Sequence, residues 1–290
     1  MVLLISRIKI LNQFKKKKTP PIIIGGVGGS GTRLIAQILM DIGYYFGNEL
    51  NESNDNLWYM LLFKRVGVLH LSDKDFSETL NILVTALSKK GSLSNKQKNT
   101  VNQIAKIDRN FYNKDGFQRL AKSLINNHNN KHIQKWGWKE PNSHIVIKQI
   151  RKSIPDMKYI HVIRNGLDMA FSDNQNQLKL WGKYYIESDI NTPRNSLKFW
   201  CVVHKKLLEY SQSMQENFYL LNFDDFCENS KQGLQKLEEF LKVKLKPDQI
   251  QHILSLVNPL KSVGRYKRHN LSIFDKKDID YVKQLGFDTQ

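Results

Sequence analysis

The sequence has few cysteines and no long hydrophobic run, and both absences limit what the protein can be. Cys201 and Cys227 are its only cysteines in 290 residues, which is too few for a disulfide framework. They fit a reducing compartment, so we expect a cytoplasmic location. No apolar stretch reaches the length of about 18 residues that a membrane-spanning helix needs.

The amino-terminal segment also lacks the features of a secretion signal. Residues 1–18 alternate isoleucine and leucine with lysine and arginine. They contain neither a continuous apolar core nor a small-residue cleavage site. We expect a basic lead-in of 18 residues followed by a single domain at residues 19–290. The alternation leaves open a contact of the lead-in with a membrane surface.

Acidic residues are scarce relative to basic ones. Lysine and arginine number 45 against 27 aspartates and glutamates, a formal net charge of +18. This excess favours polyanionic partners, such as nucleic acid, a polyphosphorylated cofactor or an acidic glycan. The sequence has no RNP motif, zinc-finger spacing or recognisable helix-turn-helix, so we expect no specific nucleic-acid binding. No cluster of histidine and cysteine suggests a metal site, and we expect none.

Hydrophobic patterning predicts strands that alternate with helices. Runs of apolar residues indicate strands near residues 22–24, 133–141, 157–165 and 217–226. Helical spacing indicates helices at residues 34–39, 75–90, 95–110, 115–130, 143–155, 194–213, 230–243, 247–257 and 276–285. The alternation predicts an α/β fold, a P-loop-type parallel sheet covered by helices on both faces. The polar helices within about residues 74–130 are interpreted as a helical insertion.

The segment from residue 21 to 39 carries the clearest functional signal. It has a β-branched run, then a glycine-rich turn from Gly25 to Arg33, then an amphipathic helix. Backbone N–H groups in such a turn, with the positive end of the helix, hold a phosphate. A Walker A loop needs a lysine directly after its last glycine, where this chain has Thr32. We therefore predict a phosphate cradle formed by Gly28, Gly29, Ser30, Gly31, Thr32 and Arg33.

Further cationic residues follow the predicted strands. Lys139 ends the second strand, in Lys-Glu-Pro, and Arg164 ends the third, with Ser172 eight residues later in the following helix. Gly264 and Arg265 lie near the carboxyl terminus. Because open α/β sheets bind ligands at the carboxyl ends of their strands, these residues should converge with the glycine turn. A cradle and a second group of cations indicate a ligand with two phosphates.

In this order, the motifs resemble those of the sulfotransferase superfamily over roughly residues 20–290, in its bacterial and tyrosylprotein-type branch. VGGSGTR is similar to that family's 5′-phosphosulfate loop, and IHVIRNGLDMAFS to its 3′-phosphate motif. The resemblance implies 3′-phosphoadenosine 5′-phosphosulfate (PAPS) as donor and adenosine 3′,5′-bisphosphate (PAP) as product. It implies in-line transfer of a sulfuryl group to a hydroxyl or amine, with Arg164 and Ser172 at the 3′-phosphate and Lys139 at the sulfuryl group. Residues 19–290 would then be one catalytic domain.

Two positions depart from the family pattern. The usual basic residue before Ser-Gly-Thr is Gly29 here, and the usual second threonine is Arg33. Arg33 either replaces the lost cation or points outward, in which case Lys139 alone holds the sulfuryl group. A third reading is a family member that binds the donor without turning it over.

The resemblance also implies an acidic general base about twenty residues after the glycine turn. Glu52 is the preferred residue, ahead of Glu49 and Asp55; His144 and Glu140 are further candidates. The catalytic set is therefore predicted as Lys139, Glu52 and Arg33.

The acceptor and the rival functions stay open. The positive charge favours an acidic glycan or peptide as acceptor, and the oligomeric state is undetermined. The aromatic residues Trp58, Tyr59, Trp136 and Trp138 fit a core better than an acceptor surface. One rival is a P-loop nucleotide kinase or hydrolase, disfavoured because the third strand ends in Arg164 and Asn165 without a Walker B acid. The other is a basic nucleic-acid-binding protein with a degenerate P-loop.

Overall fold

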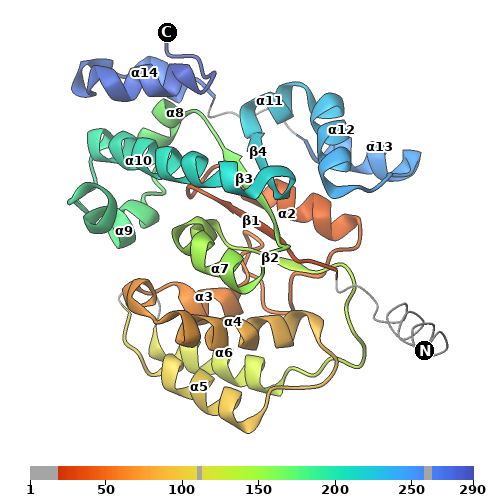
Figure 1. Ribbon diagram of the computed structural model, residues 1–290. Helices are drawn as coiled ribbons and strands as arrows, with labels where there is room; N and C mark the ends of the chain where they lie inside the picture. Colours follow the sequence, from red (N-terminus) through yellow and green to blue (C-terminus); the bar gives the residue numbers. More distant parts are fainter. Residues whose placement is uncertain (1–18, 110–112, 258–262) are drawn as a thin grey trace, which may run out of the picture.

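A parallel sheet forms the centre of the molecule. The computed structural model describes residues 19–109, 113–257 and 263–290. Within these ranges lie four strands: β1 (Ile22–Gly26), β2 (Gly137–Lys139), β3 (Lys158–Ile163) and β4 (Phe218–Asn222). All pair in parallel, in the order β2-β1-β3-β4 (Figure 1). The predicted α/β class is confirmed. Residues 1–18, for which the sequence predicts a basic lead-in and leaves open a contact with a membrane surface, lie outside the described residues.

Helices connect and cover the strands. The α-helices are α2 (Thr32–Asp41), α3 (Leu57–Phe63), α4 (Asp73–Ser88), α5 (Asn95–Ala105), α6 (Lys114–Asn126), α7 (Ile147–Ser153), α8 (Gly166–Ala170), α9 (Asn176–Ile186), α10 (Pro193–Ser211), α11 (Phe223–Glu228), α12 (Ser230–Leu241), α13 (Pro247–Leu256) and α14 (Lys276–Gln284). The 3₁₀-helices are η1 (Val66–His70), η2 (Pro141–Val146), η3 (Gln212–Asn217), η4 (Arg265–Arg268) and η5 (Leu271–Ile273). No helix in the described ranges is long and apolar enough to cross a membrane.

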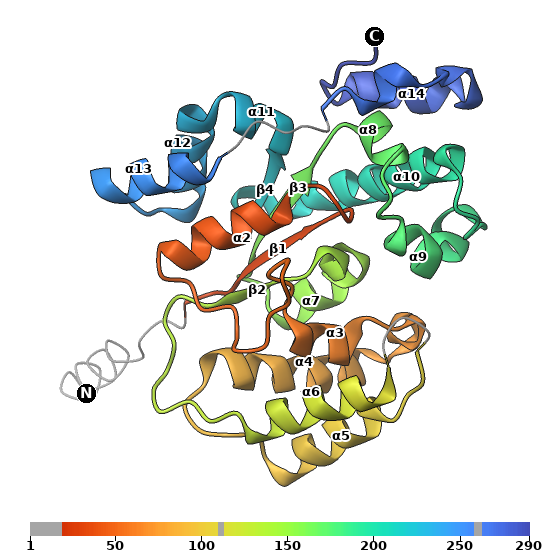
Figure 2. The same cartoon turned by 180° about the vertical axis from the view of Figure 1, so that it is seen from behind.

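The two faces of the sheet bury different sets of side chains, because successive residues of a strand point to opposite faces. Ile22, Ile24 and Ile160 pack with α2, α12 and α13, the helices seen in Figure 2 on the face turned toward the viewer. Ile23 and Tyr159 belong to the other cluster, with α7 and α10. Both faces are therefore covered, as predicted.

Helices α3 to α6 gather beside the edge strand β2 (Figure 1). Their apolar side chains share one core cluster with the sheet, to which Trp138 of β2 belongs. The predicted helices of residues 74–130 are thus present, and the division of the chain into domains stays a prediction. The four aromatic residues that the sequence offered as core or acceptor surface are all buried in this cluster: Trp58, Tyr59, Trp136 and Trp138.

Three elements differ from the predicted pattern. Helix α9 was not predicted. The second strand is only three residues long, and η2 begins two residues after it, at Pro141. The fourth strand ends at Asn222, whose side chain accepts the N–H groups of Asp224 and Asp225 and so caps α11. That cap converts the predicted end of the strand into a helix start.

Candidate functional site

A left-handed glycine turn joins β1 to α2. Gly29 and Gly31 have φ angles of +92° and +95°, a region that glycine enters without the steric cost of a Cβ. Gly31 is the N-cap of α2, and no side chain caps this helix end. The first N–H groups of a helix have no acceptor within it. Together with the partial positive charge of the helix, they can bind an anion.

Ser30 lies inside this turn. Its N–H donates to the carbonyl of Val27 (3.1 Å), and its hydroxyl is buried with no hydrogen-bond partner among the described residues. A buried hydroxyl without a partner costs about 1–3 kcal/mol. An oxygen of a bound phosphate would supply that partner, so the residues of this turn fit a phosphate group.

Close packing keeps the turn in this shape. A Cβ on Gly26 would lie 2.6 Å from the carbonyl oxygen of Val162, and one on Gly31 would lie 2.4 Å from the ring of Phe223. The buried side chain of Gln177 donates its Nε2 to the carbonyl of Gly26 (3.0 Å). Gln177 is not among the predicted site residues, because it lies on α9, a helix that the hydrophobic pattern does not predict.

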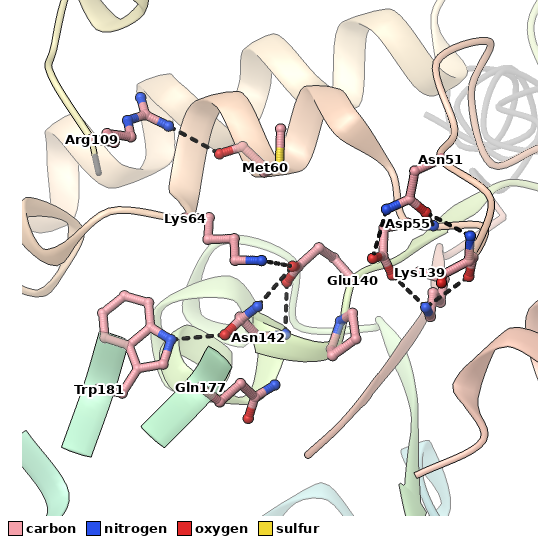
Figure 3. A network of polar contacts seen from close by, with 12 residues as sticks. Asn51, Asp55, Met60, Lys64, Arg109, Lys139, Glu140, Asn142, Gln177 and Trp181 are labelled. Atoms are coloured by element: carbon pink, nitrogen blue, oxygen red, sulfur yellow. Dashed lines mark hydrogen bonds and ion pairs between the residues drawn. The ribbon is translucent and has the colours of Figure 1, made fainter. Parts of the chain in front are cut away.

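Lys139 is the last residue of β2, and only 2% of it is exposed. Its Nζ forms an ion pair with the carboxylate of Asp55 and donates to the carbonyl of Ser53 (2.9 Å) (Figure 3). Both partners belong to residues 51–56, here called the acidic loop. A buried ammonium needs such partners, because burial without them is strongly unfavourable.

The side chain of Asn51 gives the acidic loop its shape. Its Oδ1 accepts the N–H groups of Ser53 and Asp55, both at 2.9 Å. Its Nδ2 donates to Oδ2 of Asp55 (3.0 Å). The N–H of Asn56 donates to the carbonyl of Lys139 (2.7 Å). The Asp55 carboxylate is therefore oriented by two donors, the Asn51 amide and the Lys139 ammonium.

Arg33 lies at the junction of α2 and the acidic loop. Its side chain is exposed, and Nη2 donates to the hydroxyl of Ser53 (2.9 Å). The contact ties the first turn of α2 to the loop that also binds Lys139. The role of Arg33 toward a sulfuryl group stays a prediction.

The three acidic candidates for the general base have different surroundings. Asp55 contacts Lys139. Glu49 pairs with Arg119 at 3.1 Å. Glu52 is exposed, and within the described ranges its carboxylate has no hydrogen bond or ion pair. The structure thus brings Asp55, rather than the preferred Glu52, to Lys139.

Glu140 belongs to a separate buried network (Figure 3). Its carboxylate accepts the N–H and the side-chain amide of Asn142, both at 2.7 Å, and pairs with Lys64 at 3.7 Å. Asn142 accepts in turn from Nε1 of Trp181 (2.8 Å). Burial raises the pKa of Glu140, although Lys64 acts to lower it. Because these donors already bind its oxygens, Glu140 is unsuited to proton transfer. It instead links α3 to α9, through Lys64 at the end of α3 and through Asn142 to Trp181 of α9.

The other outside candidate, His144, is also part of the interior. It is 5% exposed, and its Nδ1 lies 2.8 Å from the carbonyl of Pro141. Since a carbonyl only accepts, Nδ1 carries the proton. Burial lowers the pKa of His144 to about 4, so the ring is neutral near pH 7.

Arg164 follows β3 and is held by an acid from the next strand's end. Its Nε donates to Oδ1 of Asp224 (3.2 Å), while Oδ2 accepts the N–H of Asn165 (2.9 Å). Burial raises the pKa of Asp224, and the Asn165 N–H and Arg164 act to lower it. The contact fixes the direction of a guanidinium that is only 7% exposed.

Ser172 lies just beyond the end of α8. The prediction that it lies inside a helix is wrong. The amide of Gln175 donates to the carbonyls of Met169 (2.9 Å) and Ser172 (2.8 Å). In a continuing helix, backbone N–H groups of the next turn would donate to these carbonyls. Here the Gln175 side chain donates to them instead, and the chain leaves the helical path after α8. The Ser172 hydroxyl lies 3.8 Å from the position of a Cβ on Gly29. Ser172 therefore adjoins the glycine turn.

The carboxyl-terminal segment reaches the same region. The N–H of Gly264 donates to Oδ2 of Asp168 (2.9 Å). Nη1 of Arg265 donates to the carbonyl of Phe171 (3.2 Å), a residue 94 positions earlier in the chain. This contact places Arg265 beside Ser172.

These groups share one edge of the sheet. The glycine turn follows β1, Lys139 ends β2, Arg164 follows β3 and α11 follows β4. All four strands are parallel. One anion cradle therefore lies between a buried ammonium and a buried guanidinium, with Ser172 and Arg265 alongside. The structure brings the residues predicted for donor binding to this edge, whereas in the described ranges Glu52 has no hydrogen bond or ion pair with Lys139. What each of these residues does stays a prediction.

Comparisons with solved structures find distant likenesses of fold. The sulfotransferase domain of the curacin biosynthetic pathway is 14% identical, with 94% of this chain and 100% of that chain covered and a TM-score of 0.48. The Mycobacterium avium sulfotransferase STF9 is 12% identical, with 100% and 81% covered and a TM-score of 0.49. Retinol dehydratase, solved with retinol and PAP, is 14% identical, with 96% and 85% covered and a TM-score of 0.45.

Sequence comparison gives the family. A search of curated proteins finds no match to this chain. The model of the sulfotransferase family matches residues 20–247, well over half of the 290 residues and a range that includes the glycine turn, Lys139, Arg164 and Ser172. The chain belongs to the sulfotransferase family.

Proposed function

We propose that this sulfotransferase transfers the sulfuryl group of PAPS to a hydroxyl or amine and releases PAP. The observation that carries the proposal is the arrangement at the sheet edge. A glycine turn that fits a phosphate adjoins a second group of anion-binding residues, Ser172 and Arg265. PAPS has two phosphate-bearing ends, which matches this pair of sites.

The two ends of the donor have separate binding residues in this proposal. Backbone N–H groups from Gly28 to Arg33, and the hydroxyls of Ser30 and Thr32, bind the 5′-phosphosulfate. Arg164, Ser172, Gly264 and Arg265 bind the 3′-phosphate. The Asp224 carboxylate supports this role for Arg164, because it holds the guanidinium in one direction.

Lys139 supplies the charge that the family pattern places in the glycine turn. During in-line transfer, a bond forms between sulfur and the acceptor oxygen or nitrogen, and the bond to the 5′-phosphate oxygen breaks. Negative charge grows on that leaving oxygen. The Lys139 ammonium stabilises this charge more effectively at a buried position than in water.

Asp55 is the general base in this proposal, in place of Glu52. The Asp55 carboxylate takes the proton from the attacking hydroxyl or amine of the acceptor substrate as the new bond to sulfur forms. Its contacts with Asn51 and Lys139 support the assignment, because they orient an acid beside the group that acts on the sulfuryl. The Asp55 side chain is 20% exposed, so an acceptor can reach it.

The acceptor class follows from charge. A net charge of +18 attracts acidic molecules, and we propose an acidic glycan or an acidic peptide as acceptor.

The free thiols of Cys201 and Cys227 support a cytoplasmic location, since the cytoplasm keeps thiols reduced.

A thermal-shift titration tests the donor class. PAP at a hundredfold excess over its Kd should raise the Tm by about 5 °C, and ATP with Mg²⁺ should raise it less. A larger shift with Mg²⁺–ATP, or none with PAP, would contradict the proposal. A panel of glycans, peptides and small alcohols with ³⁵S-labelled PAPS then identifies the acceptor.

A further inference from the structure

Asp168 is a buried carboxylate that the proposed reaction does not use. It lies on α8, between Arg164 and Ser172, and is only 2% exposed. Its two oxygens accept two backbone N–H groups from the distant carboxyl-terminal segment. Oδ2 accepts from Gly264 (2.9 Å) and Oδ1 from Tyr266 (3.0 Å).

The two N–H donors flank Arg265. A carboxylate that binds the residues on both sides of an arginine fixes the backbone from which that arginine projects. Gly264 has a φ angle of +73°, a left-handed conformation that turns the chain into η4 at this point. The Arg265 side chain is held as well, because Nη1 donates to the carbonyls of Phe171 (3.2 Å) and Asp168 (3.4 Å).

The remaining donors of Arg265 suit an anion. Among the described residues, its Nε and Nη2 have no hydrogen-bond acceptor, whereas Nη1 is engaged. The neighbouring Ser172 hydroxyl adjoins the glycine turn. Guanidinium donors left over beside a serine hydroxyl are a suitable arrangement for a phosphate.

We propose that Asp168 is a positioning residue for the 3′-phosphate: it holds the Gly264–Tyr266 backbone so that Arg265 meets that phosphate together with Ser172. The inference rests on the proposed PAPS-dependent function. The proposal places the Asp168 carboxylate close to a bound phosphate, and two negative groups repel each other. Both oxygens of Asp168 are satisfied by backbone donors, so the carboxylate acts through the backbone it holds.

The test compares PAP with adenosine 5′-monophosphate (AMP), which lacks the 3′-phosphate. Asp168→Asn keeps the side-chain shape, but its amide nitrogen cannot accept an N–H. Loss of one of the two backbone bonds should weaken PAP binding by about tenfold or more. AMP binding, measured by the same calorimetric titration, should change by less than about twofold.

Asp278→Asn is the matched control. Asp278 is a buried acid, 4% exposed, on α14, and in the described ranges its side chain has no hydrogen bond to residues 264–266. Its substitution removes a buried charge from the same part of the molecule without loosening Arg265. PAP and AMP affinities should both stay at the wild-type level.

The double variant Asp168→Asn/Arg265→Ala tests the route of the effect. If Asp168 acts through Arg265, the double variant binds PAP as Arg265→Ala alone does. Equal losses for PAP and AMP in Asp168→Asn, or tighter PAP binding, would overturn the proposal. Should Asp168→Asn not fold, Arg265→Ala decides: an unchanged ratio of PAP to AMP affinity also overturns it. Failure of the wild type to bind PAP at all would instead reject the donor.

Discussion

Lys139 and Asp55 form the ion pair on which the proposed chemistry depends. The lysine is buried and the aspartate partly exposed, so one partner faces the interior and the other can meet an acceptor. A buried ammonium stabilises new negative charge strongly, because the surrounding medium screens it less than water does. This asymmetry assigns the charge-stabilising role to Lys139 and the proton-accepting role to Asp55.

Replacement of Lys139 by methionine should reduce kcat more than PAP affinity. Methionine fills similar space without the charge, and we expect kcat to fall by about 100-fold or more with PAP affinity within about threefold. Turnover of ³⁵S-labelled PAPS and a PAP titration measure the two effects. Equal losses in both would assign Lys139 to donor binding only.

The paired variants Asp55→Asn and Glu52→Gln identify the base. Each removes one carboxylate from the acidic loop, but only Asp55 contacts Lys139. Asp55→Asn should lower kcat by about 100-fold, and Glu52→Gln should leave it within about twofold. The opposite order would assign the base to Glu52, the residue that the resemblance to the family favours.

At the scale of elements, the junction between β1 and α2 depends on the shape of one turn. Gly31 caps the helix with a φ angle of +95° while the Phe223 ring closes the space where a Cβ would lie. The turn is therefore constrained twice, by its backbone conformation and by the packing of α11 against it.

Gly31→Ala should destabilise the protein and abolish the increase in the free energy of unfolding that PAP binding causes. Gly43→Ala is the matched control, since Gly43 has a φ angle of +93° but no atom within 4 Å of the added Cβ. We expect Gly43→Ala to cost about 1 kcal/mol and Gly31→Ala at least about 2–3 kcal/mol. Urea unfolding with and without PAP measures both, and equal behaviour of the two variants would show that the packing against Phe223 is unimportant.

The sequence predicted the strand ends better than the contacts between elements. Lys139 and Arg164 could be identified because each follows an apolar run, and strand ends share an edge in a parallel sheet. The choice of Asp55 over Glu52 could not be made, since both lie in one loop and only tertiary contact with Lys139 separates them. Asp224, the partner of Arg164, lies 60 positions away. The sequence predicts Ser172 inside a helix, because local periodicity carries no information on the side-chain hydrogen bonds that Gln175 makes.

At the scale of the whole molecule, the sheet buries three histidines against one another. The ring centroid of His161, on β3, lies 5.8 Å from that of His144 and 5.1 Å from that of His204. The Tyr159 ring stacks beside it. Burial lowers the pKa of all three, to about 4 for His144 and about 3 for His204. The folded state therefore keeps these rings neutral at the centre of the molecule.

Stability should fall as the pH falls below the ordinary histidine pKa of 6.5. Between pH 6.5 and about 4 the unfolded chain binds protons that the folded chain excludes, so unfolding becomes more favourable. At pH 5 the loss should be about 2 kcal/mol for each of His144 and His204, and His161 should add to it. Urea unfolding from pH 7.5 to 5 measures it. His161→Asn, which cannot titrate, should show a smaller loss, and an identical loss would contradict this account.

A crystal structure of the PAP complex tests the central claim most directly. The account predicts the 5′-phosphate in the turn between Gly28 and Arg33, with the 3′-phosphate bound by Arg164, Ser172 and Arg265. Lys139 should then lie next to the 5′-phosphate, where the sulfuryl group would be attached. PAP bound away from the carboxyl edge of the sheet, or with its two phosphates exchanged between these positions, would contradict the account.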